Sequence, residues 1–197
     1  MKLAGKKWIA VVLALLMTAA LGATALAAET DTATREERLQ AREQKIEEAQ
    51  AKVAENEAKL QEKMSTLGEF GQKVAELRLT ILENRKDNLA LTQDINALRT
   101  SLVQALTALK GSGASLPEDT LTQLKTLRDQ AKSIAEQIKA TKGDIKEIAQ
   151  ANRANIRAKD YEAVAAAFEQ IEEIQISRND LLLQMKDVLT QMNGLVS

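Results

Sequence analysis

Residues Leu39–Leu109 read LQAREQKIEEAQAKVAENEAKLQEKMSTLGEFGQKVAELRLTILENRKDNLALTQDINALRTSLVQALTAL, with an apolar residue at nearly every seventh position. Such a repeat, uninterrupted by proline, is typical of a long α-helix that keeps one seam against partner helices, because seven residues make nearly two turns. The members of this first column are Leu39, Ile46, Val53, Leu60, Leu67, Val74, Ile81, Asn88, Ile95, Leu102 and Leu109. The repeat therefore predicts an all-α protein organised around one long heptad-patterned helix.

The amino-terminal part of this stretch, residues 35–66, has a weaker seam than the rest. Its second column holds only polar or small residues, namely Arg42, Ala49, Asn56 and Lys63. A seam that is half polar buries little, so we expect a projecting amphipathic helical arm. The arm's apolar column is then a candidate association seam for another copy of the chain, formed by Leu39, Ile46, Val53, Leu60 and Leu67.

Two glycines, Gly68 and Gly71, follow the arm. Each costs about 1 kcal/mol in a helix interior, so a break is one possibility. Because the heptad phase continues through both, we favour a continuous, soft helix.

Residues 67–197 carry a wider apolar face, which indicates burial against more than one neighbour. Gly113 in the sequence Gly-Ser-Gly is expected to end the first helix with a left-handed cap. A second helix should run from Pro117 to about Ile156, and a third should begin at the capping residue Asp160 and end at Asn193-Gly194. Short connections force antiparallel neighbours, so the expected body is an antiparallel three-helix bundle.

The first 27 residues resemble a secretory leader, with three lysines, an apolar run from Trp8 to Leu21, and small residues ending in Ala27. We expect a signal peptide at 1–27 and a flexible tether at 28–34, which places the protein outside the cytoplasmic membrane, in periplasm, cell envelope or medium. The alternative is that the apolar segment is retained as a membrane anchor. The chain has no cysteine, so its stability must come from packing rather than disulfides.

The composition excludes several classes of function. The chain has no histidine, which removes the commonest general base and the commonest metal ligand. Its 27 basic and 28 acidic residues leave a net charge of −1, and loss of the leader's lysines makes it more acidic, which disfavours nucleic acid as a partner. No phosphate-binding loop or calcium loop is present, so we expect no enzyme activity, no catalytic residue, no metal and no cofactor.

Polar residues interrupt the predicted seams at one level of the bundle. If the helices fold back near Gly113 and Lys159, the second helix faces both the first and the third at this level. The interior polar layer would then consist of Asn84, Asn88, Thr141, Gln175 and Arg178. Such a layer fixes register, because a slip would bury these groups unpaired, and it is a candidate seat for a peptide or small polar ligand. The alternative is coincidence, with Arg178 reaching water through its long side chain.

The leader, the all-helical amphipathic body, the small size and the absence of cysteine resemble the small extracytoplasmic helical chaperones of the Spy, CpxP and Skp kinds. This resemblance is one of architecture over the mature chain. The Spy and CpxP group carries L-T-x-x-Q signatures, and the glutamine is missing after Leu79-Thr80, Leu91-Thr92, Leu121-Thr122 and Leu189-Thr190. The Skp group is typically basic, whereas this chain is acidic. The resemblance implies a chaperone-like protein that holds partner polypeptides.

Three functions remain open on the sequence alone. The first is a non-catalytic exported binding protein, a chaperone or stress-related adaptor, whose helix faces hold a partner polypeptide. The second is a structural coiled-coil spacer of the cell envelope that self-associates. The third is a membrane-anchored accessory subunit, which requires the leader to stay uncleaved. In the first two cases the partner is protein, and the membrane is not involved after cleavage.

Overall fold

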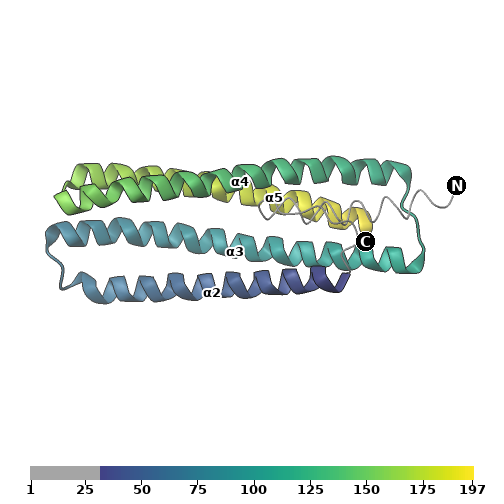
Figure 1. The fold of residues 1–197 in the computed structure, drawn as a ribbon, viewed down its shortest axis with the longest axis horizontal. Helices are drawn as coiled ribbons and strands as arrows, with labels where there is room; N and C mark the ends of the chain where they lie inside the picture. The colour runs from purple at the N-terminus through teal and green to yellow at the C-terminus, as the bar shows by residue number, and fades with distance from the viewer. Residues whose placement is uncertain (1–31) are drawn as a thin grey trace. The chain divides into compact units, whose positions relative to one another are not determined.

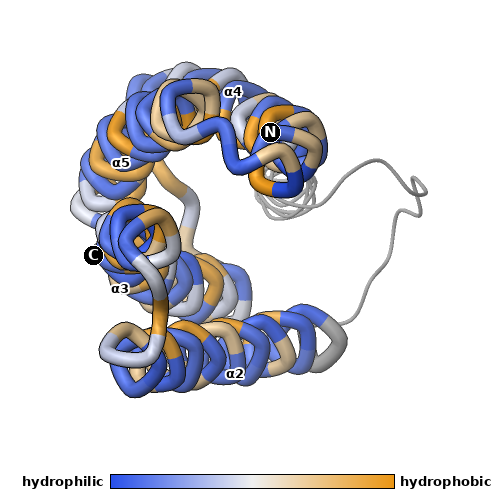
Figure 2. The backbone as a smooth tube through the Cα atoms, turned by 90° about the vertical axis from the view of Figure 1, so that its left-hand side faces the viewer, coloured by the Kyte–Doolittle hydropathy of each residue, from blue (hydrophilic) through white to orange (hydrophobic). Residues whose placement is uncertain are grey.

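The computed structural model describes residues 32–197, which form four α-helices and no strand. The helices are α2 (Thr32–Met64), α3 (Glu69–Ser112), α4 (Glu118–Ala158) and α5 (Tyr161–Val196), joined by short connections (Figure 1). Hydrophobic residues recur among hydrophilic ones along each helix (Figure 2). The all-α prediction is confirmed. Within the described part of the chain, no helix is long and apolar enough to cross a membrane.

The signal peptide expected at residues 1–27 lies outside the described residues, as do residues 28–31 of the expected tether. Residues 32–34, the rest of that tether, belong to α2.

The long first helix is divided between α2 and α3, where the sequence favoured a continuous helix. Two backbone bonds close the end of α2, from Thr66 N to the Lys63 carbonyl at 3.0 Å and from Leu67 N to the Met64 carbonyl at 3.2 Å. The Thr66 hydroxyl also donates to the Lys63 carbonyl at 2.7 Å. From α3, Gln72 Nε2 donates to the carbonyls of Met64 at 3.4 Å and Leu67 at 3.1 Å. These bonds satisfy carbonyls that a helix end leaves free, and so offset the cost of the break.

The break allows α2 to pack against the rest of the chain, which differs from the expected projecting arm. Leu39 and Ile46 are 5% exposed and Val53 is 1% exposed, while Leu60 and Leu67 are half-buried. The half-polar second column therefore did not prevent burial, because the apolar column by itself supplies a continuous contact surface.

The chain divides into two compact units, and each of the four helices contributes a segment to each. Unit 1 contains residues 32–44 with Gln93–Gln137 and Leu183–Ser197. In unit 1, α2 and α3 run antiparallel, since Asn96 Nδ2 donates to the Leu39 carbonyl at 3.3 Å and Gln93 Nε2 donates to Glu43 Oε1 at 2.9 Å.

Helices α3 and α5 of unit 1 run in the same direction. Lys186 Nζ donates to Asp94 Oδ2 at 2.7 Å, and further along both helices Asn193 Nδ2 donates to the Leu98 carbonyl at 3.0 Å. The core of unit 1 consists of residues that are at most 2% exposed, namely Ile95, Leu102, Leu106, Leu124, Met185, Leu189 and Met192. Truncating one such leucine to alanine typically costs about 2–5 kcal/mol.

Unit 2 contains Lys45–Thr92 and Ile138–Leu182. Its α3 segment contacts α2, where Lys86 Nζ lies 3.9 Å from Glu57 Oε2, and also contacts α5. Its apolar cluster is centred on Val74, Val164 and Phe168. Half-buried residues pack around that cluster, namely Phe70, Leu77, Ile81 and Ile156. The Phe70 and Tyr161 rings meet edge to face at 6.4 Å.

Two of the helix ends follow local signals in the sequence. Gly113 has φ of 71°, which confirms the left-handed cap expected after α3. Asp160 Oδ1 accepts a hydrogen bond from Ala163 N at 3.1 Å, which confirms Asp160 as the cap of α5. The other end of α5 differs from expectation, because the helix passes through Gly194 to Val196. There Asn193 donates from its side chain to α3, so it does not act as a helix terminator.

Candidate functional site

Three of the five residues expected in the polar layer line one pocket of unit 2, between α3 and α5. This pocket has a volume of about 240 Å³, and we call it the amide pocket. Its lining residues are Asn84, Asp87, Asn88, Gln175, Ile176, Asn179 and Asp180. Periodicity on two separate helices thus pointed to residues that the fold brings to one place.

The amide pocket contains polar atoms that lack a hydrogen-bond partner. Asn88 is 6% exposed, and its Nδ2 donates to the Gln175 backbone carbonyl at 3.2 Å. Its Oδ1 has no partner, nor has Oε1 of Gln175, whose side chain is also 6% exposed. Asn84 Nδ2 is a third such atom. Residues that line the pocket therefore carry two buried acceptors and one buried donor without a partner, and each such group costs about 1–3 kcal/mol.

The other two residues of the expected layer pair with each other instead. Arg178 Nη1 lies 3.5 Å from the hydroxyl oxygen of Thr141, and neither residue lines the amide pocket. Burial, and next the charge of Arg85, lower the pKa of Arg178 below its ordinary value. From the sequence we expect Asn84 and Asn88 beside Thr141. The structure instead bonds Asn88 to α5, because in unit 2 the contacts of α3 include α5.

The rim of the amide pocket is acidic and partly apolar. Asp87 and Asp180 are exposed, and Ile176 is 52% exposed. The exposed isoleucine can contact an apolar group, and the two carboxylates attract positive charge.

The residues expected to form an association seam are placed differently. Leu39, Ile46 and Val53 are buried within their own chain, as described above, so they present no free apolar strip to another copy.

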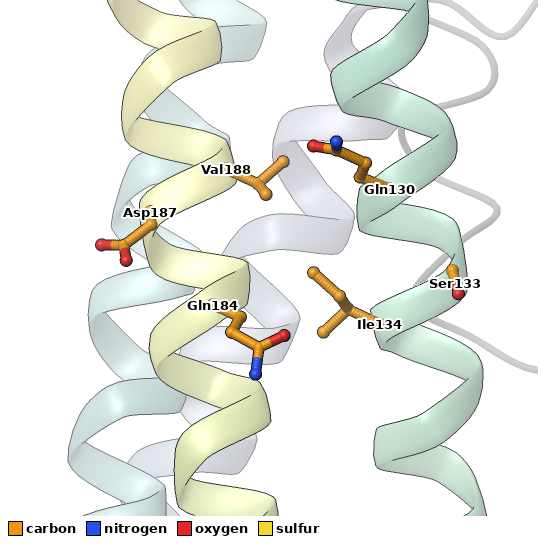
Figure 3. Close-up of a pocket in the computed structure, with 6 residues that line it drawn as sticks. All are labelled: Gln130, Ser133, Ile134, Gln184, Asp187 and Val188. Atoms are coloured by element: carbon orange, nitrogen blue, oxygen red, sulfur yellow. The ribbon is translucent and has the colours of Figure 1, made fainter.

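A second pocket, in unit 1, was not foreseen from the sequence. It has a volume of about 390 Å³ and lies between α4 and α5. Figure 3 shows Val188 opposite Gln130 and Gln184 opposite Ile134, whereas the Asp187 and Ser133 side chains point away. The lining is mixed, and none of its polar atoms is both buried and unpaired. Its lining therefore has fewer unpaired polar groups for recognising a ligand than the lining of the amide pocket.

Unit 1 also holds a polar network that the heptad columns did not single out. Asn96 is 3% exposed, and its Nδ2 donates to Glu43 Oε2 at 2.7 Å. Arg99 lies one turn further along α3, where its Nη2 lies 3.8 Å from Met185 Sδ and its buried Nη1 has no partner. The sequence feature that could have indicated this network is Arg42, a charged residue in the second seam column. Arg42 is half-buried in the structure.

Among residues 32–197 no group of three or more carboxylates is placed to hold a metal ion. No protein-family model, curated protein or solved structure matches the chain.

Proposed function

We propose that this protein is a non-catalytic, exported binding protein that holds a segment of a partner polypeptide at the amide pocket. The observation that carries the proposal is the set of buried, unpaired atoms on Asn84, Asn88 and Gln175. Two successive peptide groups present two N–H donors and a C=O acceptor, which complement these two acceptors and one donor. In the bound state, these three atoms would form hydrogen bonds that they lack in the free protein.

The rim residues define the kind of segment that fits. Ile176 provides an apolar contact at its exposed side chain, and Asp87 and Asp180 provide negative charge. A segment with an apolar residue flanked by lysine or arginine satisfies both features. The chaperone-like role implied by the resemblance, with extracytoplasmic location, is consistent with holding short segments of this type in many partners.

The binding test uses fluorescently labelled ten-residue peptides, one with a central leucine between lysines and one with the lysines replaced by glutamates. We expect anisotropy titrations to show saturable binding of the basic peptide that weakens as salt is raised. Equal binding of both peptides, or of neither, would contradict the assignment of the pocket.

A pair of matched variants localises the binding. Ile176 and Leu183 are both exposed on α5, at 52% and 44%, but only Ile176 lines the amide pocket. Ile176→Ser should weaken peptide binding by about tenfold, the loss expected for roughly half of an isoleucine's burial. Leu183→Ser should leave binding unchanged. If both variants bind alike, the peptide does not sit at this pocket.

The exported location has its own test. Amino-terminal sequencing of protein recovered from outside the cytoplasm should begin at Ala28. An intact Met1 on that material would mean that the leader is retained, as the accessory-subunit hypothesis requires.

A further inference from the structure

The connection between α2 and α3 is short, because α2 ends at Met64 and α3 begins at Glu69. The apolar heptad column nevertheless keeps its seven-residue spacing across this connection, from Leu60 through Leu67 to Val74. If residues 65–68 adopted helical dihedral angles, α2 and α3 would join into one helix with its apolar column on a single face. The same sequence is therefore compatible with a hairpin and with a straight helix.

The bonds that close the hairpin are local, and a straight helix would replace them. Thr66 N and Leu67 N each donate to a carbonyl three residues earlier, whereas in an α-helix they would donate to carbonyls four residues earlier. Helical backbone bonds would likewise take up the carbonyls of Met64 and Leu67, which accept from the Gln72 side chain in the hairpin. A Cβ atom added at Gly68 would meet nothing within 4 Å, so no neighbour packs tightly against this position.

The polar contacts between α2 and α3 are centred on this connection. The contacting pairs are Leu39 with Asn96 at 3.3 Å, Glu43 with Gln93 at 2.9 Å, and Glu57 with Lys86 at 3.9 Å. In the sequence, the middle of each pair falls between Leu67 and Gln72. Two straight helices that cross antiparallel at this point would therefore bring the same residues together, with the two members of each pair on different copies of the chain.

We propose that two copies of the chain exchange α2 and form a dimer, in which α2 of each copy packs on α3 of the other. Leu39, Ile46 and Val53 remain buried in the dimer, because the exchange reproduces the contacts that bury them within one chain. Exchange of an identical element is a favourable route to a symmetric dimer, since only the connection changes conformation. The exchange does not depend on peptide binding, because no residue of α2 lines the amide pocket.

Two substitutions at the connection test the exchange by light scattering over a range of concentrations, after refolding from urea. Gly68→Ala favours the straight helix, because alanine is the better residue in a helix interior and the poorer one at the cap position before α3. Since both chains of the dimer gain, we expect its dissociation constant to fall at least tenfold. Glu69→Pro places proline at the first residue of α3, where it is tolerated, but breaks any helix that continues through this position. This variant should be monomeric at every concentration.

Each substitution has a matched control. Gly143→Ala makes the same exchange at an open position inside α4, away from the connection, and should leave the dissociation constant unchanged. Glu69→Ala removes the exposed ion pair of Glu69 with Lys73 without introducing proline, and should dimerise like the unmodified protein. A Gly68→Ala protein that stays monomeric, or an undiminished dimer of Glu69→Pro, would overturn the proposal.

Cross-linking distinguishes exchange from association of closed chains. A carbodiimide couples a carboxylate to an amine in contact with it, as in the pair of Glu57 and Lys86. The experiment refolds a mixture of isotope-labelled and unlabelled protein, separates dimer from monomer, and identifies the cross-linked peptides by mass spectrometry. The product that joins Glu57 to Lys86 should combine labelled and unlabelled halves in the dimer and never in the monomer. A dimer in which the two halves always carry the same label would mean that the copies associate without exchanging α2, and would overturn the proposal.

Discussion

Replacing Asn88 by leucine should make the protein more stable while removing its binding function. Asn88 occupies an apolar heptad column and is 6% exposed, and leucine has the same branched shape with a larger volume, for which the adjoining amide pocket provides space. The substitution removes the Nδ2 bond to the Gln175 carbonyl, which contributes about 0.5–1.5 kcal/mol. It also removes the unpaired Oδ1, whose burial costs about 1–3 kcal/mol.

The balance is favourable because leucine also adds apolar surface to the contact between α3 and α5. That burial contributes about 1–2 kcal/mol at the usual coefficient for apolar area. The net expectation for Asn88→Leu is a gain of about 1–3 kcal/mol in the free energy of unfolding. In thermal terms, each kcal/mol corresponds to roughly 2–4 °C in a chain of this size.

The assay is urea unfolding followed by far-ultraviolet circular dichroism, with the midpoint and slope fitted together. Asn56→Leu is the matched control, because Asn56 is exposed on α2 and its effect should lie within about 0.5 kcal/mol. The basic peptide should no longer bind Asn88→Leu, although its fold is intact. A lower unfolding free energy for Asn88→Leu would mean that Oδ1 is already satisfied, and would refute the argument for an unpaired pocket.

Three further predictions concern α2, a helix cap and a buried charge. Val53→Ala should lower the free energy of unfolding by about 1–3 kcal/mol, since Val53 is 1% exposed; no loss in urea unfolding would mean that α2 projects. Gly113→Ala should cost about 1–2 kcal/mol because φ is 71°, whereas Gly143→Ala, with open space around it inside α4, should gain about 0.5–1 kcal/mol. Arg99 has a pKa lowered to about 9, so above that pH the unfolded state binds more protons and stability should rise with pH. Urea midpoints at about pH 8 and about pH 10.5 should therefore rise more in the unmodified protein than in Arg99→Met, and parallel changes would contradict the burial of a charged Arg99.

The sequence by itself determined the helical class and the faces that are buried. All eleven members of the first heptad column, from Leu39 to Leu109, are buried or half-buried. Helical periodicity and the caps at Gly113 and Asp160 act over a few residues, so they can be read without knowledge of the fold. The polar residues Asn84, Asn88 and Gln175 were also recognisable, because each occupies a seam column where an apolar residue is expected.

Tertiary structure decided which helices meet and where the first helix breaks. Periodicity identifies a buried face but not the helix that covers it, which is why Asn88 bonds to α5 and not to Thr141 of α4. At residues 65–71 the cost of two glycines is about 2 kcal/mol, too small to settle continuity against break by local sequence. Packing of Leu39, Ile46 and Val53 within the chain favours the break, and the same packing of α2 lets Asn96 Nδ2 donate to the Leu39 carbonyl. Those contacts join residues more than fifty positions apart in the sequence, where no local pattern can specify them.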